Sequence, residues 1–120
     1  MTLSKRIVIL ACAVVLMAAA VSCDRRWSPE MVRETENRGE VIQRALTQHQ
    51  QALGVYPDQL EALVPRFLSS IPLPTVGAHR WEYRAYDDGH YYRLRVAINS
   101  NAEPLLQTDS SPGGWSYDTK

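Results

Sequence analysis

The sequence predicts an α+β fold in which one long amphipathic helix packs on a small antiparallel sheet of three or four strands. Two observations lead to this prediction. Between Ser28 and Gly54, residues suited to a core recur at spacings of three and four, as on one face of a helix. From Trp81 onward, apolar and polar residues alternate in steps of two, as in half-buried strands. An isolated hairpin is marginal in water, so the sheet needs the helix as a cover.

The predicted helix has a clear start and a clear end. Ser28 can cap the first free amides, Pro29 suits the first helical position, and Glu30 complements the helix dipole. Gly54 suits a left-handed cap at the other end. The expected buried stripe consists of Met31, Thr35, Gly39, Ile42, Ala45, Leu46, His49 and Leu53. Because the stripe is thin near its start, residues 29–38 are expected to project as a stalk.

The connecting stretch "YPDQLEALVPRFLSSIPLP" predicts a short helix followed by an extended segment. Pro57 can start the helix, and Pro65 ends it because its ring blocks further helix. Pro72 and Pro74 favour an extended chain. The residues expected to plug the core from this stretch are Phe67, Leu68 and Ile71.

Two hairpins are predicted after residue 80. The first joins two alternating runs through "DDGH", and Asp-Gly between such runs is a strong hairpin signal. Its inward residues are expected to be Trp81, Tyr83 and Tyr92. The second joins "PLLQT" to "WSYD" through residues 110–114.

Residues 1–22 have the layout of a secretory signal, with Lys5 and Arg6 before an apolar run. As a helix, residues 7–22 would be about 24 Å long, shorter than the bilayer core of about 30 Å. Removal of the signal leaves a net charge of −2, because only Lys5 and Arg6 are lost. A nucleic-acid partner is therefore not expected, since phosphate-binding surfaces carry a strong basic excess.

After cleavage, Cys23 would be the only thiol, because Cys12 leaves with the signal. An unpaired cysteine in an exported protein is a reactive liability unless the protein uses the thiol. The stretch Ala20-Val21-Ser22-Cys23 resembles the lipobox of bacterial lipoproteins, with Ala20 in place of the preferred leucine. The resemblance implies acylation of Cys23, with membrane lipid as a partner. Residues 23–28 would then be the lipid anchor and tether, and 29–120 the domain. Two or three acyl chains hold a protein on a membrane stably.

Ordinary signal cleavage after Ala18-Ala19-Ala20 is the alternative, and it would leave a soluble protein beginning at Val21. Asp24 after the cysteine resembles the inner-membrane retention signal of enterobacterial lipoproteins. This resemblance favours a location in the bacterial cell envelope, on the inner membrane and facing the periplasm.

A second resemblance concerns the head. Its residues are Ala45-Leu46, Gly54-Val55-Tyr56-Pro57, Leu60, Leu63-Val64-Pro65, Phe67-Leu68, Ile71-Pro72, Pro74, Trp81, Tyr83, Tyr92 and Leu94. In this order they resemble the globular part of type II secretion pseudopilins, especially the major one, and of type IV pilins. The match covers roughly residues 40–98. It implies a pilin-like head and a secretion-type or pilus-type machine as partner.

The chain departs from that family in two respects. Pseudopilins begin with a prepilin-peptidase site and a long apolar helix that builds the filament, whereas here the apolar run ends at Cys23. The major pseudopilin also has an aspartate-rich calcium loop, whereas this C-terminus offers only Asp109 and Asp118. Calcium takes six to eight oxygen ligands, so no metal or other cofactor is expected. Ordinary filament assembly is not expected either.

The sequence offers little support for catalysis. His49 falls on the helix stripe, where a partly buried, hydrogen-bonded role is expected. His90 follows Asp87 and Asp88, but Asp-Asp-Gly is first of all a turn. No nucleophile, zinc or phosphate motif occurs. The protein is therefore not expected to be an enzyme.

Tyrosine, tryptophan and arginine dominate protein-binding surfaces, and they cluster in the last third of the chain. Five of them, Arg84, Tyr86, Tyr91, Arg93 and Arg95, are predicted on the sheet face opposite the core. They form either a solvated face or an interaction surface. The expected function is that of a non-catalytic envelope lipoprotein that binds an envelope protein. The alternatives are a lipid-tethered receptor for a small ligand, sugar or peptide, and a small hydrolase.

Overall fold

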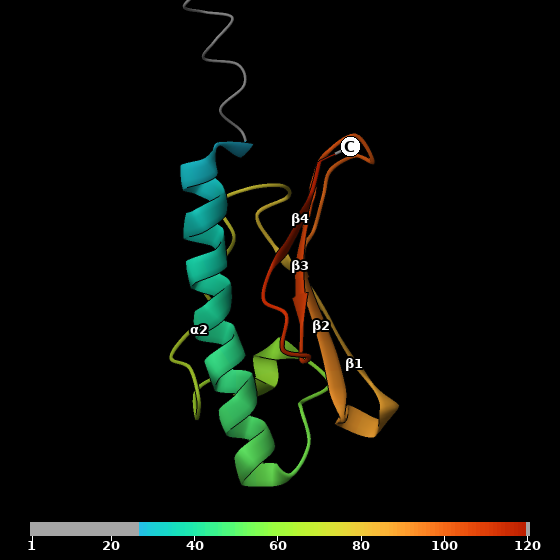
Figure 1. The fold of residues 1–120 in the computed structure, drawn as a ribbon. Coiled ribbons are helices and arrows are strands. Elements are labelled where there is room, and N and C mark those ends of the chain that lie inside the picture. The colour runs from blue at the N-terminus through green and yellow to red at the C-terminus, as the bar shows by residue number, and fades with distance from the viewer. Residues whose placement is uncertain (1–26, 120) are drawn as a thin grey trace, which may run out of the picture.

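The computed structural model describes residues 27–119. One long helix lies along one face of a four-stranded antiparallel sheet, and the connecting segment passes between the two layers and around the helix (Figure 1). This arrangement confirms the predicted α+β class. The predicted signal, Cys23 and Asp24 lie outside the described residues. Within residues 27–119, no helix is both long and apolar enough to cross a bilayer.

Helix α2 runs from Pro29 to Leu53 and has the predicted caps. The Ser28 hydroxyl accepts a hydrogen bond from the Met31 amide at 3.3 Å. At the other end, Gly54 has a φ of 85° and donates its amide to the Gln50 carbonyl at 2.7 Å. A left-handed residue here satisfies one of the free carbonyls of the last turn. The helix bounds are confirmed.

The buried stripe of α2 differs from the prediction at both ends. The buried residues are Val32, Thr35, Gly39, Ile42, Ala45, Leu46 and His49. Met31 and Leu53, which were predicted to be buried, are 37% and 54% exposed. A helix turns by about 100° per residue, so the two successive four-residue steps from Met31 to Thr35 and Gly39 rotate Met31 off the stripe. Val32 is the residue that takes its place.

The prediction of a stalk over residues 29–38 is wrong. Thr35 is fully buried, and its hydroxyl lies 2.9 Å from the Thr75 hydroxyl. The Thr75 amide also donates to the Thr35 hydroxyl, at 3.1 Å, and the Thr75 hydroxyl donates to the Met31 carbonyl, at 3.0 Å. Arg38 donates to the Leu73 carbonyl at 2.9 Å. These bonds fasten the connecting segment to the first half of the helix.

The connecting segment contains a short 3-10 helix, η2, from Leu60 to Leu63. Pro57 does not start this helix, contrary to the prediction. Instead the Pro57 carbonyl accepts a hydrogen bond from the Tyr83 hydroxyl at 2.6 Å, and η2 begins only after Gln59, whose backbone is extended. Leu60 and Leu63 are buried. The predicted plugs Phe67, Leu68 and Ile71 pack against the core as expected.

Both predicted hairpins are confirmed. The strands are β1 (Trp81–Tyr86), β2 (Tyr91–Val96), β3 (Leu105–Asp109) and β4 (Ser116–Asp118), in the order β1-β2-β3-β4.

The first turn contains the short 3-10 helix η3 (Asp87–Gly89). Gly89 has a φ of 85°, and a Cβ there would lie 2.9 Å from the Tyr56 carbonyl oxygen. The glycine therefore allows both the turn and its contact with residues 55–56.

The core lies between α2 and the sheet in two clusters. The first contains Ile42, Ala45, Leu46, Leu60, Leu63, Tyr92 and Leu94, and the second contains Val32, Val76, Val96 and Leu106. Trp81 and Trp115 pack against both clusters, with ring centroids 6.0 Å apart. A Cβ at Gly39 would lie 2.2 Å from the Trp115 ring. Gly39 thus lets the indole of Trp115 approach the helix backbone.

Trp27 belongs to the folded head. Its indole donates to the Glu103 carboxylate at 3.2 Å, and its ring lies 6.2 Å from that of Tyr117. It also packs against the second core cluster. Trp27, the first residue that the structure describes, is therefore part of the packed head.

We expect Gly39→Ala to destabilise the full-length protein, although alanine normally favours a helix interior by about 1 kcal/mol. The added methyl displaces Trp115, and overpacking of a core typically costs about 1–3 kcal/mol. Thermal unfolding should show a melting temperature lower by several degrees. Asn37→Ala, at an exposed position of the same helix, is the matched control and should raise it slightly. A rise for both variants would contradict the role given to Gly39.

We also expect Thr35→Val to destabilise the protein, by about 1–3 kcal/mol, because it leaves the part-buried Thr75 amide without its hydrogen-bond acceptor. Thr47→Val is the control. Within the described residues its exposed hydroxyl bonds only to the Gln43 carbonyl of the same helix, so the change should stay within about 0.5 kcal/mol. Urea unfolding measures both variants, and equal midpoints would refute the importance of the Thr35–Thr75 bond.

Candidate interaction surface on the outer sheet face

The sheet has an inner face toward α2 and an outer face. Alternation along β2 buries Tyr92, Leu94 and Val96 against the helix and turns the residues between them outward. All five predicted surface residues share the outer face. The register pairs Arg84 with Arg93, Tyr86 with Tyr91 and Glu82 with Arg95. The term outer face is used below for Glu82, Arg84, Tyr86, Tyr91, Arg93, Arg95, Gln107 and Asp109.

Arg84, Tyr86 and Arg93 form a cluster in which a tyrosine ring lies beside two guanidinium groups. The guanidinium carbon of Arg84 lies 5.0 Å from the Tyr86 ring centroid, and that of Arg93 lies 5.5 Å from it. Within residues 27–119, neither arginine has an ion pair with a carboxylate. Like charges opposite each other on paired strands are unfavourable. The ring contacts therefore hold two cations together, and the hydrogen-bond donors of both have no partner in the part of the chain that the structure describes.

Arg95 differs from the other two arginines because it has a partner. Its Nε donates to the Glu82 carboxylate at 2.5 Å, and both side chains are about 40% exposed. Such an exposed pair contributes little stability. Its effect is to neutralise Arg95, which the sequence prediction had grouped with Arg84 and Arg93. Glu82 was missed, although pairing of Tyr86 with Tyr91 across the "DDGH" turn places it opposite Arg95.

Two hollows flank the Arg93–Arg95 row. One has a volume of about 240 Å³ and lies over β1 and β2, lined by Glu82, Tyr83, Arg84, Tyr86, Arg93 and Arg95. The other has a volume of about 380 Å³ and continues over β3 and β4, lined by Arg93, Arg95, Leu105, Gln107, Thr108, Asp109, Gly114 and Ser116. The two arginines thus stand as a ridge that a partner could contact from both sides.

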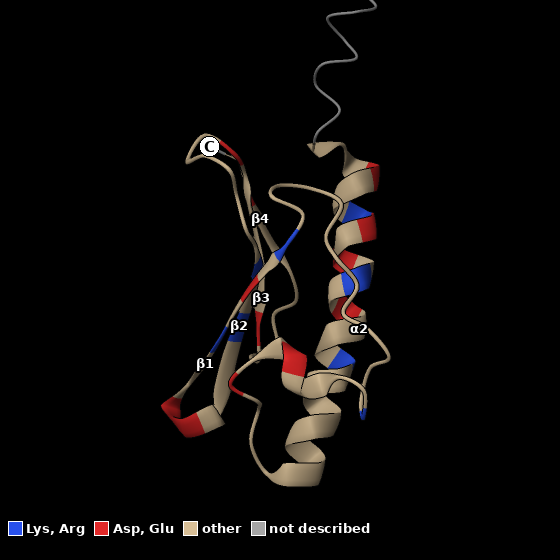
Figure 2. Cartoon of the chain, turned by 180° about the vertical axis from the view of Figure 1, so that it is seen from behind, with Lys and Arg blue, Asp and Glu red and all other residues tan. Residues whose placement is uncertain are grey.

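The ends of the outer face differ in charge. Basic side chains lie along β1 and β2, whereas the turn between them carries Asp87 and Asp88 (Figure 2). Tyr91, next to this turn, is 59% exposed. Asp109 on β3 is the register partner of Arg93. A partner of the cluster would therefore meet positive charge in the middle of the sheet and an exposed aromatic ring toward the turn.

His49 and His90 each lie within hydrogen-bond distance of the backbone carbonyl of a nearby residue. His49 is 8% exposed, and its Nδ1 lies 2.8 Å from the Val55 carbonyl oxygen, as predicted for a hydrogen-bonded core histidine. His90 Nδ1 lies 2.5 Å from the Asp87 carbonyl oxygen within the turn. In the described part of the chain, no group of three or more histidine, cysteine or acidic side chains could hold a metal.

The two C-terminal aspartates do not share a loop. Asp109 is the last residue of β3, whereas Asp118 pairs with Leu105 at the other end of that strand. Four residues of strand separate these positions by about 13 Å. Together they do not form the dense ligand set of a calcium loop.

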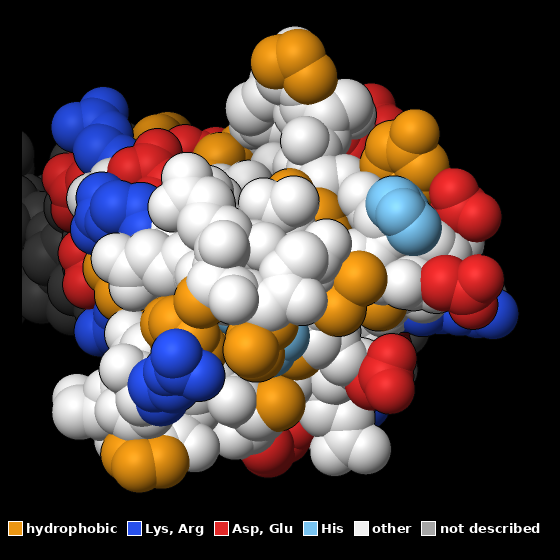
Figure 3. Space-filling view, turned by 90° about the horizontal axis from the view of Figure 1, so that it is seen from below, with side chains coloured by type: hydrophobic (Ala, Val, Ile, Leu, Met, Phe, Trp, Pro, Cys, Tyr) orange, Lys and Arg blue, Asp and Glu red, His pale blue; other side chains and the backbone are white. Residues whose placement is uncertain are grey.

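The end of the molecule formed by the α2 C-terminus and the β1–β2 turn carries scattered apolar groups. Seen from this end, hydrophobic side chains alternate with polar ones, and acidic side chains gather toward the sheet (Figure 3). Leu53 and Val55 are the exposed large hydrophobic residues of the helix end. Over the whole described head, the exposed large hydrophobic side chains are spread over α2, the connecting segment and strands β2 and β4, at Met31, Leu53, Val55, Leu73, Tyr91 and Tyr117.

Sequence reasoning missed a further hollow, between α2 and the ends of β2 and β3. Its lining includes Glu40, Gln43, Tyr56, Tyr92 and Asp109. Glu40 lies off the predicted helix stripe, and no local pattern links it to Asp109. Burial raises the pKa of the Tyr92 hydroxyl above its ordinary value, so that this group stays protonated.

In comparisons with known proteins, no family model matches the chain, and no curated protein or solved structure matches it. Function is therefore inferred from the residues themselves.

Proposed function

We propose that this chain is a non-catalytic, lipid-anchored protein of the bacterial envelope that binds an acidic segment of a partner protein on its outer face. The observation that carries the proposal is the Arg84–Tyr86–Arg93 cluster. Two guanidinium groups flank one ring at 5.0 and 5.5 Å, and neither has a carboxylate partner within residues 27–119. Arginine presents a planar set of donors that fits carboxylates, so an acidic segment would supply the missing partners.

Anchoring through Cys23 would place the head close to the bilayer. Trp27 is packed in the head, and the chain from Cys23 to Trp27 can span at most about 14 Å. Helix α2 is 25 residues long, or about 37 Å, and leads away from its first residue toward the β1–β2 turn. In this proposal the cluster lies toward the end of the head that is far from the membrane, where a partner can reach it.

The proposal includes a pilin-like head, and the roles of the resembling residues support it. Gly54 caps the helix in the left-handed conformation. Leu60 and Leu63 are buried, and Phe67 and Ile71 pack against the core. These are the packing roles that the motif encodes. A partner in a type II secretion or pilus-type machine is the corresponding proposal, with the lipid in place of the filament-building helix.

Site-specific photo-crosslinking from Tyr91 tests partner binding in intact cells. A discrete crosslinked species is expected, and Arg84→Glu with Arg93→Glu should reduce it about tenfold or more, because interface arginines commonly contribute over 1 kcal/mol each. Arg33→Glu with Arg66→Glu makes the same change of charge outside the outer face and should leave the yield unchanged. An equal yield from the two double variants, or from a crosslinker placed at the exposed Gln51, would exclude the outer face as the binding surface.

Metabolic labelling with palmitate tests the anchor. Label is expected on the full-length protein and on Cys12→Ala, but not on Cys23→Ala, because only Cys23 is the proposed acylation site. Mass spectrometry of the mature N-terminus should find an acylated peptide beginning at Cys23. An unmodified peptide beginning at Val21 would refute lipidation and leave the outer-face proposal to be tested separately.

A further inference from the structure

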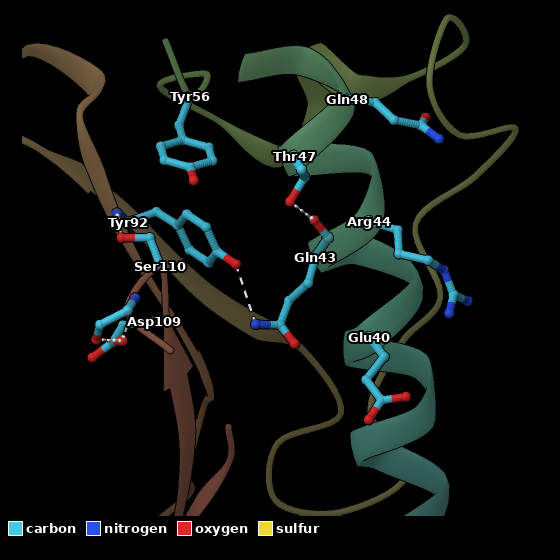
Figure 4. A pocket seen from close by; sticks show the side chains of 10 residues that line it. Glu40, Gln43, Arg44, Thr47, Gln48, Tyr56, Tyr92, Asp109 and Ser110 are labelled. Atoms are coloured by element: carbon cyan, nitrogen blue, oxygen red, sulfur yellow. Dashed lines mark hydrogen bonds between the residues drawn. The ribbon is translucent and has the colours of Figure 1, made fainter. Parts of the chain in front are cut away.

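The hollow between α2 and the sheet has the size of a small-ligand site. Its volume is about 580 Å³, within the range of about 300–1,000 Å³ typical of ligand pockets. Gln43 reaches from the helix toward Tyr92, and Tyr56 lies above the gap between the two layers, whereas Arg44 and Gln48 extend away from the sheet (Figure 4). Asp109 and Ser110 border the hollow on the side of the sheet. Of the residues that line this groove, Asp109 also belongs to the outer face, and the others do not.

Among residues 27–119, the hydrogen bonds of the groove leave one acceptor and one donor without a partner at its floor. The Gln43 amide nitrogen donates to the Tyr92 hydroxyl at 3.2 Å and to the Thr108 hydroxyl at 3.1 Å. Thr108 donates its own proton to the Gly114 carbonyl at 3.1 Å, so it must accept from Gln43, which fixes the orientation of the amide. Gln43 Oε1 therefore remains an acceptor, and the Tyr92 hydroxyl keeps its proton to donate.

The rim adds one donor and two carboxylates. The Tyr56 hydroxyl has no hydrogen bond among the described residues, and its ring lies edge-on to that of Tyr92 with centroids 4.8 Å apart. Glu40 and Asp109 have no ion pair within residues 27–119. One oxygen of Asp109 accepts from the amide and the hydroxyl of Ser111, which holds the loop and leaves its second oxygen free.

We propose that this groove binds a neutral sugar of one or two rings. A sugar hydroxyl both donates and accepts, so neighbouring hydroxyls can bond to Tyr56 and Tyr92 as donors and to Gln43, Glu40 and Asp109 as acceptors. An anionic ligand would meet the two carboxylates. A simple cation would leave the phenolic donors without acceptors. The inference goes beyond the proposed function and does not depend on it.

Titration calorimetry and amide NMR on the full-length protein test the site, with glucose, maltose, N-acetylglucosamine and N,N′-diacetylchitobiose as probes. The detergent must lack a sugar headgroup, because a maltoside would compete. At least one probe should bind with a dissociation constant of about 1 mM or below, and the largest shifts should fall at Tyr56, Tyr92, Ser110 and Ser111. Binding by none of the four, or shifts centred elsewhere, overturns the proposal.

Matched variants separate the groove from a general effect on the fold. Tyr56→Phe removes one hydroxyl and keeps the ring, and Glu40→Gln removes one charge; each should weaken binding about 2- to 10-fold, as for loss of one hydrogen bond. Glu36→Gln, on the same helix but outside the groove, should not change it. Equal affinities for Glu40→Gln and Glu36→Gln, together with no effect of Tyr56→Phe, would overturn the assignment. Arg84→Glu, which leaves Arg93 opposite Asp109 unchanged, should retain sugar binding. If no probe binds, the outer-face proposal still stands, because it rests on Arg84, Tyr86 and Arg93.

Discussion

The approach of Trp115 to helix α2 at Gly39 is the contact on which the rest of the head depends. Any larger side chain at Gly39 would overlap the indole, whose nearest ring atom would lie 2.2 Å from a Cβ. Trp115 also packs beside Trp81, and both rings contact the two core clusters. A single close approach therefore joins the helix, the start of β1 and the entry to β4. The distance between the two layers follows from it.

Because helix α2 covers one face of the sheet, the two faces of the sheet have different roles. The inner face supplies the aromatic and aliphatic groups that α2 covers, and the hydroxyls of Tyr83 and Tyr92 find partners at Pro57 and Gln43. Burial raises the pKa of both phenols, so they act as neutral hydrogen-bonding groups. The outer face has no layer over it among the described residues. Arg84 and Arg93 are held by contacts with the Tyr86 ring, and Arg95 is held by its ion pair with Glu82.

Local signals predicted much of the fold. The ends of α2 follow from Ser28, Pro29 and Gly54, because capping depends on residues next to the terminus. The first hairpin follows from its turn chemistry and from alternation, which also placed Arg84 and Arg93 on the outer face.

Contacts between residues far apart in the sequence had no local sequence pattern that could predict them. Thr35 and Thr75 are 40 residues apart, and nothing in either neighbourhood indicates that their hydroxyls bond. The prediction of a stalk over residues 29–38 was wrong for this reason. The groove between α2 and the sheet was missed for a similar reason. Gln43 and Thr108 belong to different elements, and only the packing of the two layers brings them together. The role of a mid-helix glycine such as Gly39 cannot be read from the sequence, because it depends on the side chain that packs against it, here Trp115.

The order of the strands also bears on how copies of the head behave when they are crowded together. Both margins of the sheet, β1 and β4, have backbone groups without a neighbouring strand among the described residues. Exposed margins of this kind invite pairing between molecules. Here β4 is only three residues long, and β1 carries Glu82 and Arg84 with side chains turned to solvent. Short length at one margin and charge at the other oppose the growth of a continuous sheet from head to head, so that dense populations of the protein can remain as separate units.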